Sequence, residues 1–140
     1  MQYVWQTSWG MTTRLIGAVI MTHGDDSGLI LPPRVAPTQV ILVPIPRGDW
    51  KETVLPKAQE IAATLQEAGV RIEIDAREEY KPGWKFSEWE MRGVPLRLEI
   101  GPKDIEQSQV ILVRRDTGEK IPEPMQGLST QETLLLKNLK

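Results

Sequence analysis

The sequence contains no cysteine and only one histidine, His23. Without thiols, the chain can build neither a disulfide framework nor a thiolate metal site. One imidazole is too few for the zinc and iron sites that histidines form. We therefore expect no bound metal, and we exclude the class of small secreted proteins that disulfides hold together. No serine, cysteine or acid is placed to form a catalytic triad with His23.

Long apolar segments are also missing. The stretch from Val35 to Pro46 is apolar, but it is shorter than the roughly 20 residues that a membrane-spanning helix needs. The first residues, Met1 to Tyr3, lack the basic start of a signal peptide. These features predict no membrane partner and a cytoplasmic location.

A net charge of −2 gives the chain no general attraction for nucleic acid. RNA binding would therefore depend on a local arrangement of charges and rings. The apolar share of 40% and the charged share of 26% are those of a folded globular protein. At 140 residues, we expect one compact domain with a short additional piece.

The first part of the chain predicts one strand and one helix. Residues 2–8 are rich in strand-forming types, Gly10 breaks the run, and apolar residues then recur at helical spacing over about 11–22. The segment Leu31–Arg34 contains two prolines and is stiff and extended, because a residue before proline is pushed out of the helical region. We therefore predict a first domain at 1–35 and a second at 36–140.

The second part of the chain alternates strands and helices. That order predicts the α/β class, with a mixed β-sheet flanked by helices. Asp49 and Glu52 have capping-box spacing, and we expect Pro56 in the first turn of the helix that follows. Gly101–Asp104 is typical of a turn. The predicted strands are 39–44, 70–74, 94–100 and 109–114. One predicted helix ends at residue 69, a second spans about residues 85–92, and a third starts at residue 129.

Two sets of motifs resemble one known family. The first, Thr7–Gly17, resembles motif 3 of the class II aminoacyl-tRNA synthetases in its prolyl form. The second resembles the anticodon-binding domain of prolyl-tRNA synthetases of the archaeal and eukaryotic-like type. The matching segments beyond motif 3 are His23–Leu29, Leu31–Pro37, Pro82–Phe86, Glu88–Glu90, Gly93–Pro95 and Gly101–Asp104.

The resemblance implies a ligase that activates proline with ATP and Mg²⁺ and then transfers it to tRNA(Pro). Residues 1–35 would be a strand–helix remnant of the antiparallel catalytic core, and residues 36–140 the anticodon-binding domain. Motif 1, which builds the family's homodimer, and motif 2, which binds the α-phosphate, do not occur in this sequence. The family's zinc-binding extension is absent too. We therefore expect the chain alone to be inactive and to bind no cofactor.

The resemblance also assigns residues to the ATP and proline sites. Arg14 matches the motif 3 arginine, which would bind ATP and stabilise the charge on the leaving pyrophosphate, as a planar guanidinium suits. Thr12 and Gly10 would also contact the nucleotide, Gly10 by letting the backbone come close. Ser8 and Trp9 would lie near the proline pocket. For Trp9, a place in the core is an equal alternative.

Anticodon recognition requires aromatic faces for stacking and fixed polar groups for base edges. By the family match, Phe86 would stack on a base, and Glu90, four residues later on the same helical face, would accept from guanine. Arg97 and Lys120 would reach guanine acceptors or phosphates. The alternative is core packing for Phe86 and solvent-facing charge for the other three. We expect Trp84 and Trp89 to lie in the core.

Two other functions remain open from the sequence. The chain can be a non-catalytic RNA-binding module, because the same type of domain recurs in accessory proteins, or part of a related synthetase of other specificity. The motif 3 residues Thr12 and Arg14 argue against a pure binding module. The Thr-Ser-Trp-Gly and Pro-Gly-Trp-Lys-Phe segments argue for proline.

Overall fold

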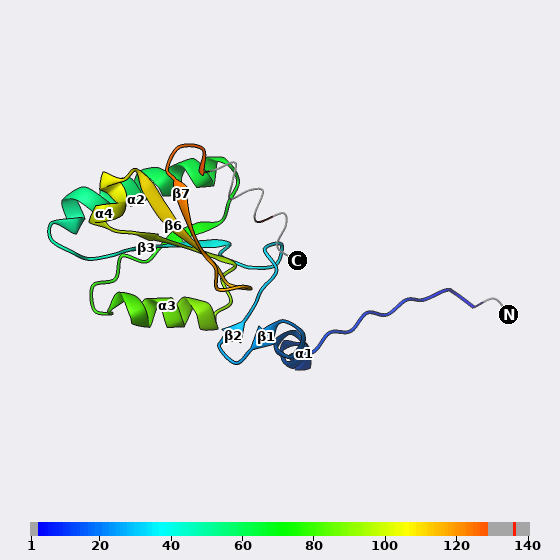
Figure 1. Ribbon diagram of the computed structural model, residues 1–140. Coiled ribbons are helices and arrows are strands. Elements are labelled where there is room, and N and C mark those ends of the chain that lie inside the picture. The colour runs from blue at the N-terminus through cyan, green and yellow to red at the C-terminus, as the bar shows by residue number, and fades with distance from the viewer. Residues whose placement is uncertain (1–2, 129–135, 137–140) are drawn as a thin grey trace.

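The computed structural model describes residues 3–128 and Leu136. Its main element is a mixed sheet of β3 (Val40–Pro44), β4 (Ile72–Ile74), β5 (Leu96–Ile100), β6 (Gln109–Arg114) and β7 (Lys120–Pro124). These strands stand in the order β4-β3-β5-β6-β7 (Figure 1). β3 is parallel to β4 and β5, whereas β6 is antiparallel to β5 and β7. The predicted α/β class with a mixed sheet is confirmed.

Helices cover both faces of this sheet (Figure 1). α2 (Trp50–Glu67) and α4 (Pro102–Glu106) lie on one face, and α3 (Pro82–Met91) lies on the other. Val40 and Leu42 of β3 belong to the core cluster under α2, whereas Ile41 and Val43 belong to the cluster under α3. Successive side chains of a strand point to opposite faces. β3 is therefore buried on both sides, which explains its uninterrupted apolar sequence.

Several predicted elements differ from the structure in their ends. An exception is the strand predicted at 109–114, which has the same bounds as β6. Pro56, expected in the first turn of its helix, lies inside α2, because α2 already begins at Trp50. Asp49 is the N-cap residue of α2, but its side chain makes no capping hydrogen bond. The helix predicted from residue 129 lies outside the described residues, apart from Leu136.

The N-terminal segment lies away from the sheet (Figure 1). It contains α1 (Arg14–Thr22) and a short antiparallel hairpin of β1 (Gly24–Asp25) and β2 (Gly28–Leu29). The strand predicted at 2–8 is wrong for residues 3–8, which are neither helix nor strand. A strand needs a neighbouring strand to pair its backbone groups, and this segment extends into open space (Figure 1). No residue of α1 is buried.

The segment between α1 and the sheet is held firmly to the sheet unit. The Leu31 N–H donates to the Gly93 carbonyl at 3.2 Å. The Arg71 guanidinium donates to the carbonyls of Pro33 and Ala36 at 2.8 and 3.0 Å. The proline-rich stretch is thus fixed by hydrogen bonds rather than free to hinge. A domain boundary at residue 35 stays a prediction.

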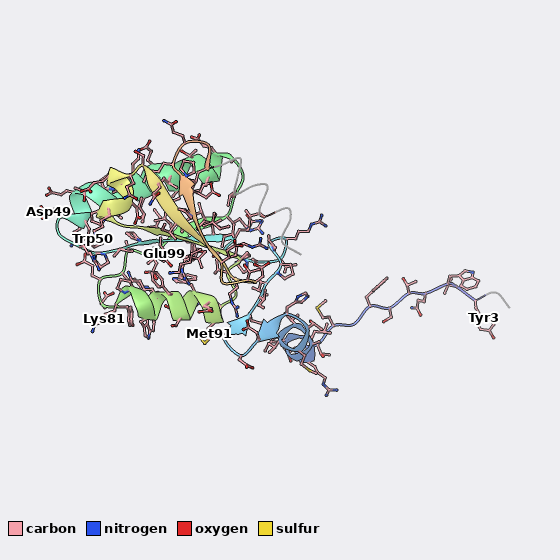
Figure 2. All side chains as sticks on the ribbon, viewed as in Figure 1. Tyr3, Asp49, Trp50, Lys81, Met91 and Glu99 are labelled. Atoms are coloured by element: carbon pink, nitrogen blue, oxygen red, sulfur yellow. The ribbon has the colours of Figure 1, made fainter. Side chains whose placement is uncertain are left out.

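Gly93 follows α3 where the hairpin packs against that helix, and Figure 2 shows Met91 at this same end of α3. Gly93 has a φ of +75°, and a Cβ there would lie 2.6 Å from Leu29 Cβ and 2.7 Å from the Leu29 carbonyl oxygen. Only glycine fits both this backbone conformation and this contact.

We predict that Gly93→Ala lowers the free energy of unfolding more than Gly69→Ala does. Gly69 has a φ of +83°, but a Cβ there meets nothing within 4 Å. Gly69→Ala should therefore cost only the conformational strain, about 1 kcal/mol. Urea unfolding followed by tryptophan fluorescence measures both values. Equal losses would show that the contact between Gly93 and Leu29 contributes nothing.

Candidate nucleic-acid interface

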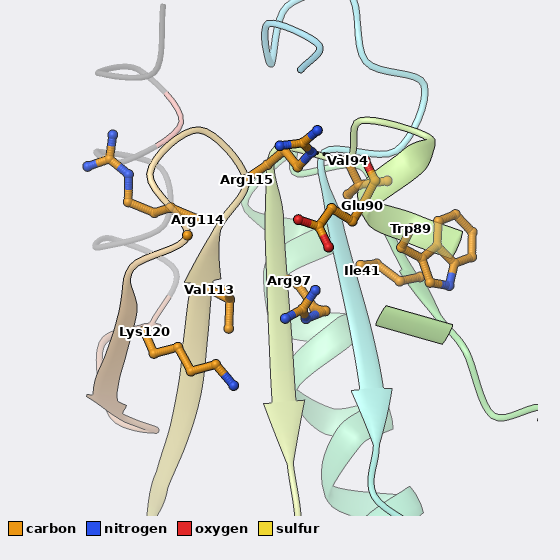
Figure 3. A pocket seen from close by; sticks show the side chains of 10 residues that line it. Ile41, Trp89, Glu90, Val94, Arg97, Val113, Arg114, Arg115 and Lys120 are labelled. Atoms are coloured by element: carbon orange, nitrogen blue, oxygen red, sulfur yellow. Dashed lines mark hydrogen bonds between the residues drawn. The ribbon is translucent and has the colours of Figure 1, made fainter. Parts of the chain in front are cut away.

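A pocket of about 140 Å³ lies on the α3 side of the sheet (Figure 3). Three of the predicted anticodon residues line it: Glu90, Arg97 and Lys120. The strand register explains why they meet. Arg97 of β5 pairs with Val113 of β6, and Val113 pairs with Lys120 of β7. These residues therefore form one row on the same face, and Glu90 of α3 lies beside it.

Phe86 and Arg97 contact each other directly. The Arg97 guanidinium lies 4.4 Å from the centroid of the Phe86 ring, which is a cation–π geometry. Phe86 is half-buried and packs against the apolar cluster under α3. The ring therefore packs against the core and contacts Arg97, which lines the pocket, and the stacking of Phe86 on a base stays a prediction.

Glu99 is a member of this site that the sequence analysis missed. It is 7% exposed, and its Oε1 accepts from Arg97 Nε at 3.1 Å and pairs with an Arg97 terminal nitrogen at 3.0 Å. Its Oε2 lies 3.6 Å from Lys120 Nζ. Figure 2 shows Glu99 on the side of the sheet that α3 covers. One buried carboxylate therefore contacts two of the four cationic side chains that line the pocket, Arg97 and Lys120.

Glu90 has a different environment. Its side chain is half-buried, and within residues 3–128 and 136 no hydrogen bond or ion pair uses its carboxylate. Its backbone carbonyl accepts from Arg115 Nε at 2.9 Å. Glu90 thus presents two acceptor oxygens to the pocket near the Arg115 charge, while its backbone is held in place.

Arg115 connects this pocket to the N-terminal hairpin. Its two terminal nitrogens bind Asp25 at 2.6 and 2.9 Å. The hydrogen bonds from Arg115 hold the pKa of the Asp25 carboxyl well below its usual range. They also raise the pKa of Arg115 itself. This ion pair joins residues that are far apart in sequence, so no local pattern could predict it.

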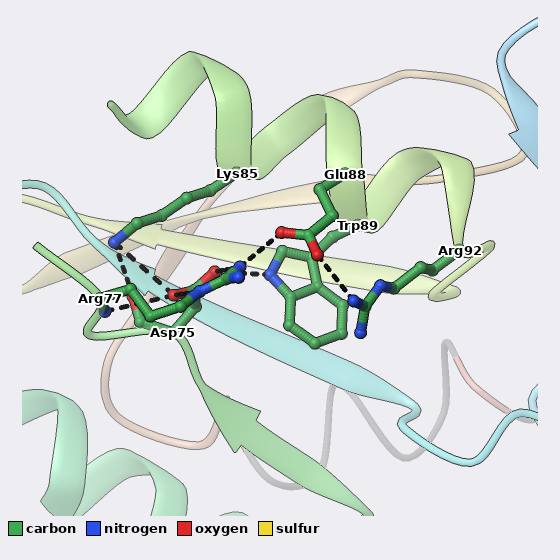
Figure 4. Close-up of polar contacts among 6 residues, drawn as sticks. All are labelled: Asp75, Arg77, Lys85, Glu88, Trp89 and Arg92. Carbon is green, nitrogen blue, oxygen red and sulfur yellow. Dashed lines mark hydrogen bonds and ion pairs between the residues drawn. The ribbon is translucent and has the colours of Figure 1, made fainter. Parts of the chain in front are cut away.

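α3 is fixed to the sheet by Asp75, a buried carboxylate just after β4 (Figure 4). It accepts from Trp89 Nε1 at 2.7 Å and from Arg77 Nε at 2.9 Å. The Lys85 ammonium, itself buried, lies 3.6 Å from Asp75 Oδ1 and donates to the Asp75 carbonyl at 3.1 Å. Burial alone would raise the pKa of Asp75, but the hydrogen bonds from Arg77 and Trp89, with the Lys85 charge, lower it below its usual range.

This arrangement sets the rotation of α3 about its axis. Lys85 and Trp89 are four residues apart and share one face of the helix. With that face held against Asp75, Glu90 points into the pocket beside β5 (Figure 3), and Phe86 contacts Arg97 of β5. Trp89 is buried, as predicted. The prediction that Trp84 lies in the core is wrong: its side chain is 46% exposed and stacks on Tyr80 with ring centroids 3.9 Å apart.

The candidate ATP and proline residues lie outside this pocket. Ser8, Trp9, Gly10 and Thr12 are on the extended N-terminal segment, and Arg14 is the first residue of α1. All five are exposed. Within residues 3–128, no group of three acidic or histidine side chains is arranged to hold a metal ion. Nor does this part of the chain contain a helix long and apolar enough to cross a membrane.

We predict that Asp75→Asn lowers the free energy of unfolding by about 3 kcal/mol at neutral pH, because it leaves the Lys85 charge buried without its partner. Asp49→Asn is the control, since the Asp49 side chain makes no capping bond, and it should change stability by less than about 0.5 kcal/mol. Chemical denaturation measures both effects. Equal effects would contradict the role given to Asp75.

The effect of Asp75→Asn should also depend on pH. The pKa of Asp75 is lower in the folded chain than in the unfolded chain. Its contribution to stability is therefore complete above about pH 4 and is lost as the pH falls towards the folded-state pKa. The difference between wild type and Asp75→Asn should narrow below about pH 4. A difference that does not change with pH would contradict the assignment.

Comparison with known proteins agrees with this geometry. A family model described as "Anticodon binding domain" matches residues 39–133. A proline–tRNA ligase of Symbiobacterium thermophilum is 53% identical over 139 residues, which is 99% of this chain and 28% of that protein. One from Clostridium novyi is 58% identical over 139 residues, again 99% of this chain and 28% of the relative. One from Natranaerobius thermophilus is 59% identical over 120 residues, 86% of this chain and 25% of the relative.

The chain thus spans about a quarter of the length of these relatives. The matched model covers β3 to β7, which include the sheet and the pocket. The resemblance drawn from the sequence motifs is confirmed. The chain belongs to the anticodon binding domain family and is similar, over nearly its whole length, to one part of the prolyl-tRNA synthetases.

Proposed function

We propose that the chain is part of a proline–tRNA ligase and that its second unit, residues 36–140, binds the anticodon of tRNA(Pro). The observation that carries this proposal is the pocket in which Glu90, Arg97 and Lys120 meet. The family match supports the binding of an anticodon, and the relatives' names support proline.

The chemistry of the pocket suits guanine. Proline anticodons carry guanine at their second and third positions, and the Watson–Crick edge of guanine offers two N–H donors. The carboxylate of Glu90 can accept both donors. Lys120, 60% exposed on its side chain, can donate to the O6 and N7 acceptors or to a phosphate. Single-stranded loops are where proteins read such edges, because the bases are unstacked there.

Phe86 and Arg97 would act together. The guanidinium covers one face of the ring, so a base that stacked on that face would displace Arg97. We propose that Phe86 supports Arg97 in the bound state and that Arg97 presents its own plane or its N–H groups to the RNA. Arginine planes stack on bases as aromatic rings do.

The first unit, residues 1–35, would contribute to the ATP and proline sites of a longer enzyme. Arg14 would bind ATP, which acts with Mg²⁺, and would stabilise the leaving pyrophosphate. Thr12 and Gly10 would contact the nucleotide. Ser8 and Trp9 would border the proline. These residues are exposed in this chain, as are the apolar side chains of α1. Exposed apolar side chains fit a segment that packs against further parts of the enzyme.

We propose that the longer enzyme is a cytoplasmic homodimer. Its dimer contacts would come from regions that this chain does not contain. The chain by itself would be inactive in aminoacylation, because it does not contain motif 2.

Binding of a labelled proline anticodon stem-loop tests the proposal. The 140-residue chain should prefer this RNA to one in which both guanines are changed. Glu90→Ala and Lys120→Ala should each reduce the preference by about tenfold, since each removes a base-edge contact. Glu106→Ala and Lys103→Ala serve as charge-matched controls, because both residues lie on α4, across the sheet from the pocket.

Equal affinity of the wild-type chain for the two stem-loops would refute the proposed anticodon reading. Loss of preference in the α4 controls would move the binding surface to the opposite face of the sheet.

A further inference from the structure

Glu99 is positioned to control two cations of the pocket, Arg97 and Lys120. It follows Arg97 by two residues on β5, so the two side chains share a face. Lys120 belongs to β7 and reaches Glu99 across β6. On that face, β6 presents Val113 and Ile111, which pair with Arg97 and Glu99 and carry no charge. Nothing on the intervening strand therefore competes for the Glu99 carboxylate.

The two oxygens of Glu99 are divided between the cations. Oε1 binds Arg97, and Oε2 lies near Lys120 Nζ. A buried carboxylate is costly unless its charge is paired. This cost favours the arrangement in which both cations point at Glu99. It restricts Lys120 above all, because that exposed side chain would otherwise sample many rotamers.

We infer that Glu99 is a positioning residue that sets the guanine discrimination of the pocket by fixing Arg97 and Lys120. The inference rests on the proposed anticodon-binding function. Glu99 does not contact RNA in this scheme, and its negative charge opposes the attraction of phosphates. It therefore improves base discrimination at some expense of general RNA affinity. Phosphate contacts supply affinity, whereas base-edge contacts supply specificity.

The variant Glu99→Gln separates these two quantities. Glutamine keeps the shape, but an NH2 group takes the place of one carboxylate oxygen, and this donor cannot pair with the cation that the oxygen contacted. The preference for the proline stem-loop over the guanine-changed stem-loop should fall by about tenfold. Affinity for the guanine-changed stem-loop should stay the same or rise, because a negative charge is gone. A residue with a purely structural role would lower both affinities together.

Glu119→Gln is the matched control. Glu119 is exposed and gives the same change of net charge; its charge acts on Arg114, but among the described residues its side chain forms no ion pair with Arg97 or Lys120. The preference of Glu119→Gln for the proline stem-loop over the guanine-changed stem-loop should equal that of wild type. A double-mutant cycle adds a second check. In the Lys120→Ala background, Glu99→Gln should have a smaller effect on discrimination than in wild type, since the two residues act together.

The outcomes separate the inference from the proposed function. A wild-type chain without guanine preference refutes the proposed function and this inference with it. A wild-type preference that survives in Glu99→Gln, or fully additive effects in the cycle, overturns the inference alone. If Glu99→Gln loses its cooperative unfolding transition, Glu99→Asp replaces it. That variant keeps the buried charge but is one methylene too short to serve both cations. It should still lose discrimination, and an unchanged preference would count against the inference.

Discussion

The buried carboxylate of Asp75 is the contact on which the site depends. It holds α3 through Lys85 and Trp89, two residues on one face of that helix. α3 is also held by the ion pair of Arg77 with Glu88 and by the hydrogen bond from Arg115 to the Glu90 carbonyl, whereas the apolar contacts under the helix are not directional. Charged hydrogen bonds are directional, so they fix which residues of α3 face β5. Glu90 lines the pocket and Phe86 contacts Arg97 for this reason.

The chain carries a net negative charge, yet we propose that its pocket binds RNA. The cations that line the pocket are already paired: Arg97 and Lys120 with Glu99, Arg114 with Asp116, and Arg115 with Asp25. Such pairs reduce the general attraction for phosphates and hold the side chains in fixed directions. A surface of this kind is built for discrimination between bases rather than for tight binding of any RNA. Bulk charge is therefore a poor guide to the function of this chain.

The sequence predicted those parts of the fold and of the candidate site that depend on local residue patterns. The bounds of β6 were predicted from its strand-forming residues, and the mixed sheet from the order of strands and helices. The motif resemblance selected three residues that the fold brings into one pocket. The strand predicted at 2–8 failed because strand propensity does not supply a pairing partner. α4 was missed because Gly101–Asp104 was interpreted as a turn. Proline at the first helical position and an acidic residue at the third are helix-start signals, and the Gly101 N–H does bond to the Asp104 carboxylate at 2.8 Å.

The contacts that sequence could not supply are those between distant segments. The role of Glu99 depends on the order β5-β6-β7 and on the register that sets Lys120 opposite Val113. The ion pair of Asp25 with Arg115 joins the hairpin to the end of β6. Neither the contact of Glu99 with Lys120 nor the ion pair of Asp25 with Arg115 has a local sequence pattern, because each depends on how non-adjacent elements pack.

Mapping the RNA-binding surface residue by residue tests the central claim most directly. The ¹⁵N-labelled chain would be titrated with the proline anticodon stem-loop and followed by NMR. The account predicts that the largest shift changes occur at Glu90, Arg97 and Lys120 and in the strands around them. Changes concentrated on α2 and α4, with the pocket residues unaffected, would contradict it.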